Sequence, residues 1–371
     1  MTRRELLAVL GTARAWGSAQ APSAPVVIAR ARSYDEDVTA VLGTLFDQLG
    51  GLGGLVKGKT VTVKLNLTGS PGLRFEGRPP GVTHYTHPKV AGSLAHLMGR
   101  AGARRVRFVE SCWGTAGPLE EYLLDAGWNV RALAAAAPRV EFENTNGQGS
   151  SKGYARLKVP GGGAIFPAYD LNRAYEQTDV FVSLAKLKEH AICGVTLSLK
   201  NVFGATPASI YGDDAGREEP NENPTKGRQN VLHEGKRPPS ASAPAELDPG
   251  SSRDPGYHLP RIVAELAAAR PIHLAIIDGV ETVAGGEGPW NEGLRRVQPG
   301  LLIAGLNPVC TDAVATAAMG FNPAASRGQP PFRVSDNTMT QAERLGLGTA
   351  DLERIEVRGL SLRAARYPFA G

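Results

Sequence analysis

The stretch DVFVSLAKLKEHAICGVTLSLKNVFG, residues 179–204, joins the pattern of a buried strand to a cluster of basic side chains. Residues 180–185 are apolar at almost every position, which is typical of a strand buried on both faces in a parallel sheet. Lys186, Lys188 and His190 follow at alternate positions, so an extended chain would present all three on one face. The stretch therefore predicts a site at the carboxyl end of a central strand.

The second half of this stretch has the period of a helix, with an apolar stripe at positions 192, 195, 199 and 202. Thr196 and Lys200 stand four residues apart on a different face, and Asn201 follows. We therefore expect a helix directly after the basic cluster, with Lys200 adding another amine to the site.

The rest of the chain alternates strand and helix patterns, which predicts one α/β domain over residues 25–371 with a mostly parallel sheet and helices on both faces. Strands are expected near residues 26–28, 60–67, 106–110, 129–133, 272–277, 301–305 and 355–357, and helices near 35–49, 88–100, 119–126, 262–269, 309–319 and 338–345. Two regions depart from the alternation. We expect a small β excursion at residues 140–170, with a hairpin around Gly161–Gly163, and a long loop insert at about residues 205–260.

The insert at about 205–260 is rich in Pro, Gly, Asn, Asp and Glu and has almost no apolar periodicity. A loop of this length is uncommon as a simple connection, and such loops are either functional lids or solvated segments. Because the insert follows directly on the basic cluster, we favour a lid, with Lys226 and His233 as its most interesting members.

Polar side chains also stand at the ends of other predicted strands. Lys64 and Asn66 end one strand, Glu110 ends the next, and Asp278 ends a third. In open parallel sheets, ligands bind beyond the carboxyl ends of the strands. These residues therefore predict a single crevice shared with residues 186–190.

Composition excludes several classes of function. The net charge of +5 over 371 residues comes with no basic run or aromatic-interleaved stripe, which argues against nucleic-acid binding. No GxSxG elbow is present, which argues against a serine hydrolase. The sequence contains no apolar run of 18 residues, so we expect no transmembrane helix. Cys112, Cys193 and Cys310 include no CxxC pair, so we expect small buried hydrophobes and neither a zinc knuckle nor an iron–sulfur cluster.

The N-terminus resembles an export signal. The segment Thr2–Leu7 has the paired arginines of a twin-arginine motif, and Ala19-Gln20-Ala21 offers a cleavage site. Arg14 and Trp16 interrupt the apolar region between them. We expect residues 1–24 to be a signal that sends the protein to the periplasm or otherwise out of the cytoplasm; the alternative is a disordered or helical extension on a cytoplasmic protein.

Histidines and carboxylates allow a divalent metal as a second kind of occupant. The candidate ligands are His87, which forms an HxxH pair with His84, together with His190, His233 and Asp278. Asp312 lies near the start of a predicted helix, where a carboxylate also suits the helix dipole.

With these residues placed, the chain resembles the family known as domain of unknown function 362 from about Val26 to Gly359. The motifs that carry the likeness are residues 63–67 (VKLNL), 86–88 (THP), 186–204 (KLKEH to KNVFG), 278–279 (DG) with 288–289 (GP), and 307–312 (NP to Asp312). The resemblance implies a shared site that includes Lys64, Asn66, Lys186, Lys188, His190, Lys200, Asn201 and Asp312. Some relatives carry a ferredoxin-like iron–sulfur module, which the three cysteines of this chain cannot build.

Two main hypotheses follow for function. The first is an enzyme for a small anionic or carbonyl substrate, with Lys186, Lys188, His190 and Lys200 as catalytic groups and Lys64, Asn66, Thr196, Asn201 and Asp312 as substrate-binding groups. The second is a protein that binds a metal, a cofactor or an anion without chemistry. A third idea, a cofactor enzyme like lactate racemase, rests only on an analogy of residue types.

Overall fold

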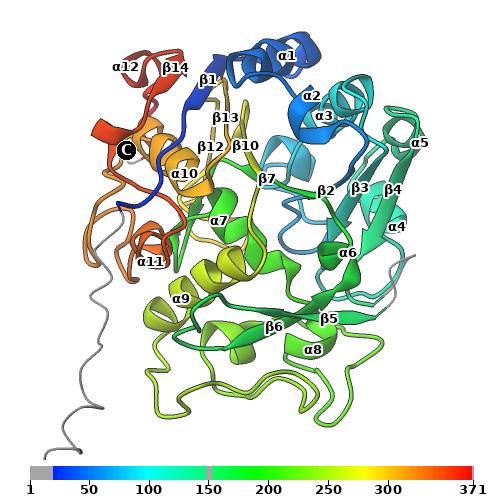
Figure 1. Cartoon of the computed structure of the whole chain (residues 1–371), viewed down its shortest axis with the longest axis vertical. Coiled ribbons are helices and arrows are strands. Elements are labelled where there is room, and N and C mark those ends of the chain that lie inside the picture. The colour runs from blue at the N-terminus through cyan, green and yellow to red at the C-terminus, as the bar shows by residue number, and fades with distance from the viewer. Residues whose placement is uncertain (1–19, 148–152, 370–371) are drawn as a thin grey trace, which may run out of the picture.

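The protein is built on a twisted eight-stranded sheet with helices on both faces, as a computed structural model describes for residues 20–147 and 153–369 (Figure 1). The strand order is β14-β1-β13-β10-β7-β2-β3-β4. These strands are β1 (Val26–Arg30), β2 (Thr60–Lys64), β3 (Arg105–Glu110), β4 (Val140–Asn144), β7 (Val180–Lys186), β10 (Leu274–Gly279), β13 (Leu301–Gly305) and β14 (Val357–Gly359).

The sheet is mostly parallel, as the alternating pattern predicted. Strands β4, β3, β2, β7 and β10 pair in parallel, whereas β13 pairs antiparallel with both β10 and β1. The carboxyl ends of β2, β3, β7 and β10 therefore meet at one edge of the sheet. This is the edge where the sequence placed its polar side chains.

Alternate strand residues feed two apolar cores, one on each face of the sheet. Val180, Val182 and Leu184 of β7 pack into the core under α1 (Val38–Gln48) and α3 (Pro88–Arg100). The intervening strand residues pack into the opposite core, which the helices α7 (Leu197–Val202), α9 (Pro255–Ala269), α10 (Pro308–Ala318) and α11 (Thr338–Arg344) complete. A strand buried on both faces needs apolar residues at consecutive positions, which explains the continuous apolar run of β7.

Helix α5 and strand β4 are among the elements that differ from the sequence prediction. Residues 129–133 were expected as a strand, but they form helix α5 (Val130–Ala134), with the Asn129 side chain accepting a hydrogen bond from the N–H of Ala132 as an N-cap. The edge strand is instead β4, which the prediction had merged into the β excursion. It pairs with β3 and follows α4 (Leu119–Asp125) and α5.

The expected hairpin around Gly161–Gly163 is present as β5 (Tyr154–Lys158) and β6 (Ala168–Asn172), which pair antiparallel. The helix expected at 262–269 begins earlier, at Pro255, which takes the first helical position.

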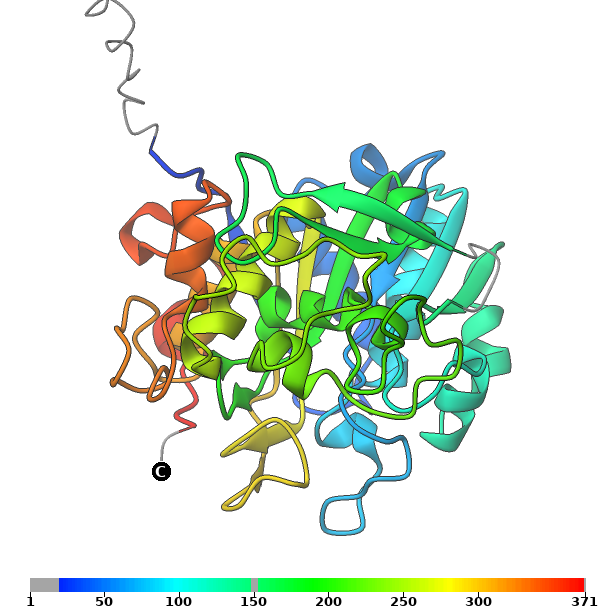
Figure 2. The ribbon, with the colours of Figure 1, turned by 90° about the horizontal axis from the view of Figure 1, so that it is seen from below.

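Before α9 begins, the insert contains short α8 (Ala208–Tyr211) and one wide helical turn, Gln229–His233, and the rest of it up to Asp254 runs as loop (Figure 2). It lies on the same face of the sheet as α7 and α9, where the β5–β6 hairpin also packs (Figure 1).

The remaining elements are short. They are α2 (Gly53–Val56), α6 (Arg173–Glu176), α12 (Leu362–Ala365), the hairpins β8 (Glu189–His190) with β9 (Gly194–Val195) and β11 (Thr282–Ala284) with β12 (Arg295–Val297), and three turns of 3-10 helix at Pro80–Val82, Phe203–Ala205 and Leu352–Arg354. Across residues 20–147 and 153–369, no helix has the length and apolar character to cross a bilayer. The twin-arginine motif lies outside the described residues.

Candidate functional site

A cavity of about 600 Å³ lies beyond the carboxyl ends of β2 and β3. Its wall comes from segments far apart in the sequence: the two strand ends, the chain from His190 into α7, the insert, and the loop between β11 and β12. The residues that line it include Lys64, Asn66, Leu67, Leu73, Glu110, Ser111, Trp113, His190, Ile192, Thr196, Lys200, Asn201, Phe203, Asp213, Arg228, His233, Glu287 and Trp290. A cavity therefore lies at the sheet edge where the sequence predicted a shared crevice, but Lys186, Lys188 and Asp278 do not line it.

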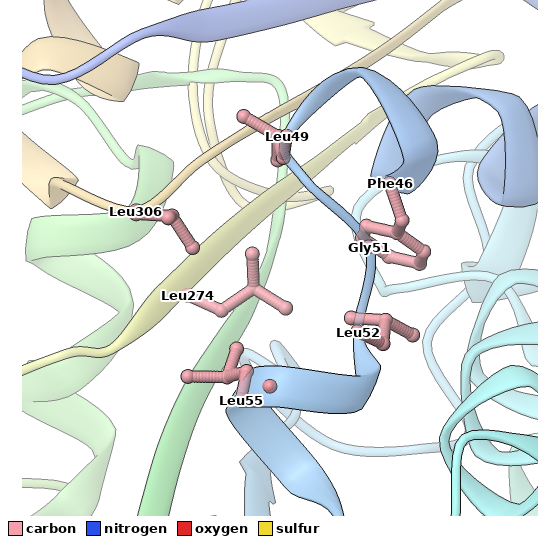
Figure 3. A pocket seen from close by; sticks show the side chains of 8 residues that line it. Phe46, Leu49, Gly51, Leu52, Leu55, Leu274 and Leu306 are labelled. Carbon is pink, nitrogen blue, oxygen red and sulfur yellow. The ribbon is translucent and has the colours of Figure 1, made fainter.

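A second hollow, of about 250 Å³, lies at the opposite edge of the sheet, beside Leu274 at the start of β10 (Figure 3). Phe46, Leu49, Leu52, Leu55 and Leu306 line it together with two glycines. Because no lining side chain is polar, this hollow offers no group for acid–base or nucleophilic chemistry.

Lys64 is held in a buried ion pair. Its Nζ lies 2.5 Å from Oε1 of Glu110, and both side chains are almost fully buried. The same amine donates to the carbonyl oxygen of Leu65 at 2.6 Å. Lys64 thus faces the cavity with its charge already neutralised by a partner.

Lys186 does not line the cavity. Its Nζ donates to Asp278 Oδ2 at 3.1 Å, to Tyr34 Oη at 2.7 Å and to the carbonyl oxygen of Gly81 at 2.8 Å, so all three ammonium hydrogens are used. Tyr34 in turn donates to Asp278 Oδ1 at 2.7 Å. Burial lowers the pKa of Lys186, and the Asp278 carboxylate opposes that shift. This network binds the ends of β7 and β10 to each other.

Lys188 is also fully buried and lies away from the cavity wall. Its Nζ donates to the carbonyl oxygens of His84 at 2.6 Å and Glu287 at 3.0 Å. Burial lowers the pKa of Lys188 to about 7. Lys188 therefore connects two loops, one of which carries the Glu287 side chain into the cavity.

Lys200 is the lysine whose amine remains available. The side chain is buried against the cavity, and its Nζ lies 4.0 Å from the centre of the Phe203 ring. Within the described residues, the Lys200 amine makes no hydrogen bond and no ion pair. Burial, together with the charges of Arg228 and Lys64, lowers the pKa of Lys200 to about 8.

The four candidate metal ligands separate into two pairs. His190 and His233 line the cavity. His87 instead caps α3 and stacks on Tyr34, and its backbone N–H donates to Asp278 Oδ2 at 3.0 Å. Among the residues that the structure describes, no three His, Cys, Asp or Glu side chains are arranged to hold a metal ion. The four residues therefore do not form the single ligand set that the sequence allowed.

The cavity contains charged groups that the sequence reasoning did not select. In the insert, Lys226 is exposed, and Arg228 reaches the cavity instead, with one guanidinium nitrogen donating to Ser111 Oγ at 2.9 Å. Glu287 accepts from the N–H of Ala191 at 2.8 Å and from Trp290 Nε1 at 3.1 Å. Although burial opposes it, the nearby His190 and these hydrogen bonds hold the pKa of Glu287 at about 2. The GGEGP sequence around Glu287 was the available signal.

Besides Lys64, three more of the proposed substrate-binding residues line the cavity. Asn66 Oδ1 accepts from the N–H of Lys186 at 3.4 Å, and Thr196 Oγ1 donates to the carbonyl oxygen of Glu189 at 3.3 Å. Asn201 donates from Nδ2 to Ser183 Oγ at 3.0 Å, whereas its buried Oδ1 has no partner among the described residues.

Asp312 does not reach the cavity, and it lies beyond the first turn of α10. It accepts from the N–H of Ser198 and of Leu199, both at 2.8 Å, and from Ser198 Oγ at 2.5 Å. The preceding Leu197 has a φ of 44°, which is unfavourable for a branched side chain. Asp312 therefore holds the start of α7, the helix that carries Lys200, in a strained geometry.

Replacing Asp312 with alanine should destabilise the protein by about 2 kcal/mol or more, because buried donors at the start of α7 lose their acceptor. Urea unfolding of the wild type, Asp312→Ala and Asp312→Asn measures the effect. The asparagine variant keeps one acceptor oxygen and should lose less stability. Equal stability of all three proteins would show that Asp312 does not anchor α7.

Known proteins provide three comparisons. A thylakoid-associated protein of Synechocystis sp. is 26% identical over 330 residues, which cover 88% of this chain and 81% of that protein. A crystal structure of a Thermotoga maritima protein matches 71% of the chain at 15% identity and a TM-score of 0.36. The structure of the lactate racemase apoprotein from Thermoanaerobacterium thermosaccharolyticum matches 75% at 12% identity and a TM-score of 0.33. The chain spans 55% of the length of each of these two structures.

The family comparison agrees with the motifs. The model of the family described as domain of unknown function (DUF362) matches residues 61–317, which contain β2, β3, β7, α7 and the cavity residues from Lys64 to Trp290. The match covers more than half of the chain, and the protein therefore belongs to the domain of unknown function (DUF362) family.

Proposed function

We propose that this protein is an enzyme that acts on a small anionic substrate carrying a carbonyl group, and that Lys200 is its reactive amine. The observation that carries the proposal is the Lys200 Nζ, which lines the cavity without a hydrogen-bond or ion-pair partner among the described residues. A lysine is a nucleophile or a base only when its amine is neutral, and burial is the usual means of producing that form near neutral pH. The pKa of about 8 for Lys200 fits this role.

The charges around Lys200 support an anionic ligand. Arg228 keeps its positive charge at any physiological pH, and it lines the cavity together with Lys200. Lys64 and Glu110 neutralise each other, which leaves Glu287 and the partly buried Asp213 as the acidic groups in the wall. Both of these carboxylates already accept backbone hydrogen bonds, from Ala191 for Glu287 and from residues 229–230 for Asp213. Arg228, which has no ion pair among the described residues, is therefore the charged group best placed to bind an anionic ligand.

Arg228 also supports a second candidate function, which is anion binding without chemistry. A fixed guanidinium inside a cavity binds a carboxylate or a phosphate whether or not a neighbouring amine reacts. The two functions differ in whether the bound molecule changes.

A proton NMR time course in deuterated buffer distinguishes the two functions, because it detects any chemical change in the probe molecule, whichever reaction causes it. The probes are pyruvate, oxaloacetate and phenylpyruvate, with acetate and lactate as matched anions that lack the ketone. We expect the wild type to consume a keto acid or to exchange its carbon-bound hydrogens for deuterium. Lys200→Met should lose this activity, and the exposed-site control Lys226→Met should keep it.

Three other outcomes of this experiment would each contradict a part of the proposal. Saturable binding of the probes without any chemical change would identify a non-catalytic anion-binding protein. Turnover that survives in folded Lys200→Met would remove Lys200 from the reaction. The absence of both binding and turnover for every keto acid would overturn the proposed substrate class.

A further inference from the structure

Two imidazoles line the same cavity as the Lys200 amine, and their hydrogen bonds fix opposite tautomers. The Nδ1 atom of His190 accepts from the backbone N–H of Ile192 at 3.1 Å and of Cys193 at 3.2 Å. A ring nitrogen that accepts hydrogen bonds carries no proton. The neutral His190 ring therefore carries its proton on Nε2, which is a hydrogen-bond donor.

His233 has the other tautomer. Its Nδ1 lies 3.1 Å from the carbonyl oxygen of Arg228, an atom that can only accept. Nδ1 must then carry the proton, which leaves Nε2 as an acceptor and a base. Within the described part of the chain, neither Nε2 atom takes part in a hydrogen bond, so both are open to a ligand in the cavity.

Both rings are neutral at physiological pH. Burial, and next the positive charge of Lys200, lowers the pKa of His190 and of His233 to about 3 each. The cavity thus contains one free amine, one neutral donor and one neutral acceptor. These three groups come from α7, from the chain before it and from the insert.

We propose that Lys200 forms an imine with the ketone carbon of a 2-oxo acid, with His233 transferring protons and His190 donating a hydrogen bond to the ketone oxygen. This inference rests on the proposed function and names its bond and its substrate class. Imine formation needs a free amine, a base for the amine protons and a donor for the oxygen that develops negative charge. The three groups provide one of each.

The step balances without another reactant. The Lys200 nitrogen adds to the ketone carbon, and the oxygen becomes an oxyanion held by the Nε2–H of His190. Nε2 of His233 takes one proton from the new ammonium group and returns it to the oxygen, giving a carbinolamine. His233 then relays the second nitrogen proton to the hydroxyl group, the C–O bond breaks, and water leaves as the C=N bond forms.

The walls of the cavity indicate what the rest of the substrate is like. Arg228 offers its charge to the carboxylate of the 2-oxo acid. Trp113 and Trp290 both line the cavity and are each 46% exposed, which places two indoles where the cavity meets solvent. Leu67, Leu73 and Ile192 add further apolar surface. A 2-oxo acid with an apolar or aromatic side chain therefore fits better than pyruvate.

Reductive trapping tests the imine directly. The full-length protein is incubated with phenylpyruvate or pyruvate and sodium cyanoborohydride, and the stable secondary amine is located by peptide mass mapping. We expect stoichiometric labelling of Lys200, and labelling by phenylpyruvate at a lower concentration than by pyruvate. Lys226→Met should be labelled like the wild type, and Lys200→Arg, verified as folded by circular dichroism, should not be labelled.

Asparagine variants test the two histidines without removing their backbone contacts. His190→Asn keeps an acceptor near Nδ1, His233→Asn keeps a donor there, and both lose Nε2. Each variant should slow labelling at least about 10-fold, while the site of labelling stays at Lys200. Labelling of both variants at the wild-type rate would overturn the roles of the histidines.

The fluorescence of Trp113 and Trp290 separates failure of the inference from failure of the proposed function. One outcome is that phenylpyruvate changes the fluorescence saturably and is consumed without forming an adduct on Lys200. That result would refute the imine but would leave the proposed enzymatic function standing. If the probes neither bind nor react, both proposals fall.

Discussion

Turnover of a 2-oxo acid should rise about 10-fold between pH 6 and pH 7, reach about half of its plateau at pH 8 and level off above about pH 9. The reaction requires the neutral amine of Lys200, and burial lowers the pKa of this group to about 8. Below that pH the reactive fraction falls in proportion to proton concentration, so activity at pH 6 should be about 1% of the plateau. Initial rates in buffers of constant ionic strength give the profile.

The groups around Lys200 determine whether this profile can be assigned to it. Those that act on its charge are Arg228, Lys64, Lys188, Glu287, Cys193, His190 and His233. The pKa values of His190 and His233 are about 3 and that of Glu287 is about 2, while burial raises the pKa of Cys193 to about 12. These four values fall outside the range from pH 6 to pH 9 where the limb is expected, whereas burial lowers the pKa of Lys188 to about 7, inside that range. A substitution at position 200 therefore decides between the two lysines.

A chemical substitution confirms the assignment. Lys200→Cys should be inactive, and alkylation with 2-bromoethylamine should restore an amine at the same position and recover part of the activity. The three native cysteines are buried. The new thiol at position 200 lines the cavity, so we expect 2-bromoethylamine to alkylate it in preference to the native cysteines. An unchanged pH limb in a folded protein that lacks any amine at position 200 would refute the assignment.

Replacing Lys186 with methionine should reduce the free energy of unfolding by about 3–5 kcal/mol, because the buried Asp278 carboxyl group would lose its cationic partner. Both side chains are fully buried, so water cannot compensate for the loss. Urea denaturation monitored by circular dichroism measures the effect.

Two controls make this stability prediction specific. Lys186→Met with Asp278→Asn removes both charges and should be more stable than Lys186→Met alone. Arg32→Met breaks an exposed pair with Glu36 at 4.0 Å and should change stability by less than about 1 kcal/mol. A loss for Lys186→Met no larger than that for Arg32→Met would mean that the buried pair does not hold β7 to β10.

The sequence by itself determined the architecture and the location of the site. The continuous apolar run of β7 required burial on both faces, and the alternation along β2 placed Val61, Val63 and Leu65 in one core while Lys64 pointed to the other side. Both patterns depend on neighbours in the chain, so they can be read locally. Residues 129–133 were misjudged because a short apolar segment fits a strand and a helix equally well, and the Asn129 cap decided for the helix.

Only the tertiary structure decided which basic residue is free to react. The sequence assigned Lys186, Lys188 and Lys200 to catalysis and Lys64 to substrate binding at one site, yet Lys64, Lys186 and Lys188 are bound by partners distant in the chain. Asp278 lies 92 residues from Lys186, and Glu287 lies 99 residues from Lys188. Such partners meet only when parallel strands bring their carboxyl ends together, and no local pattern encodes that pairing. The reactivity proposed for Lys200 depends on a fold that places its amine in a cavity, with no counter-ion among the residues that the structure describes.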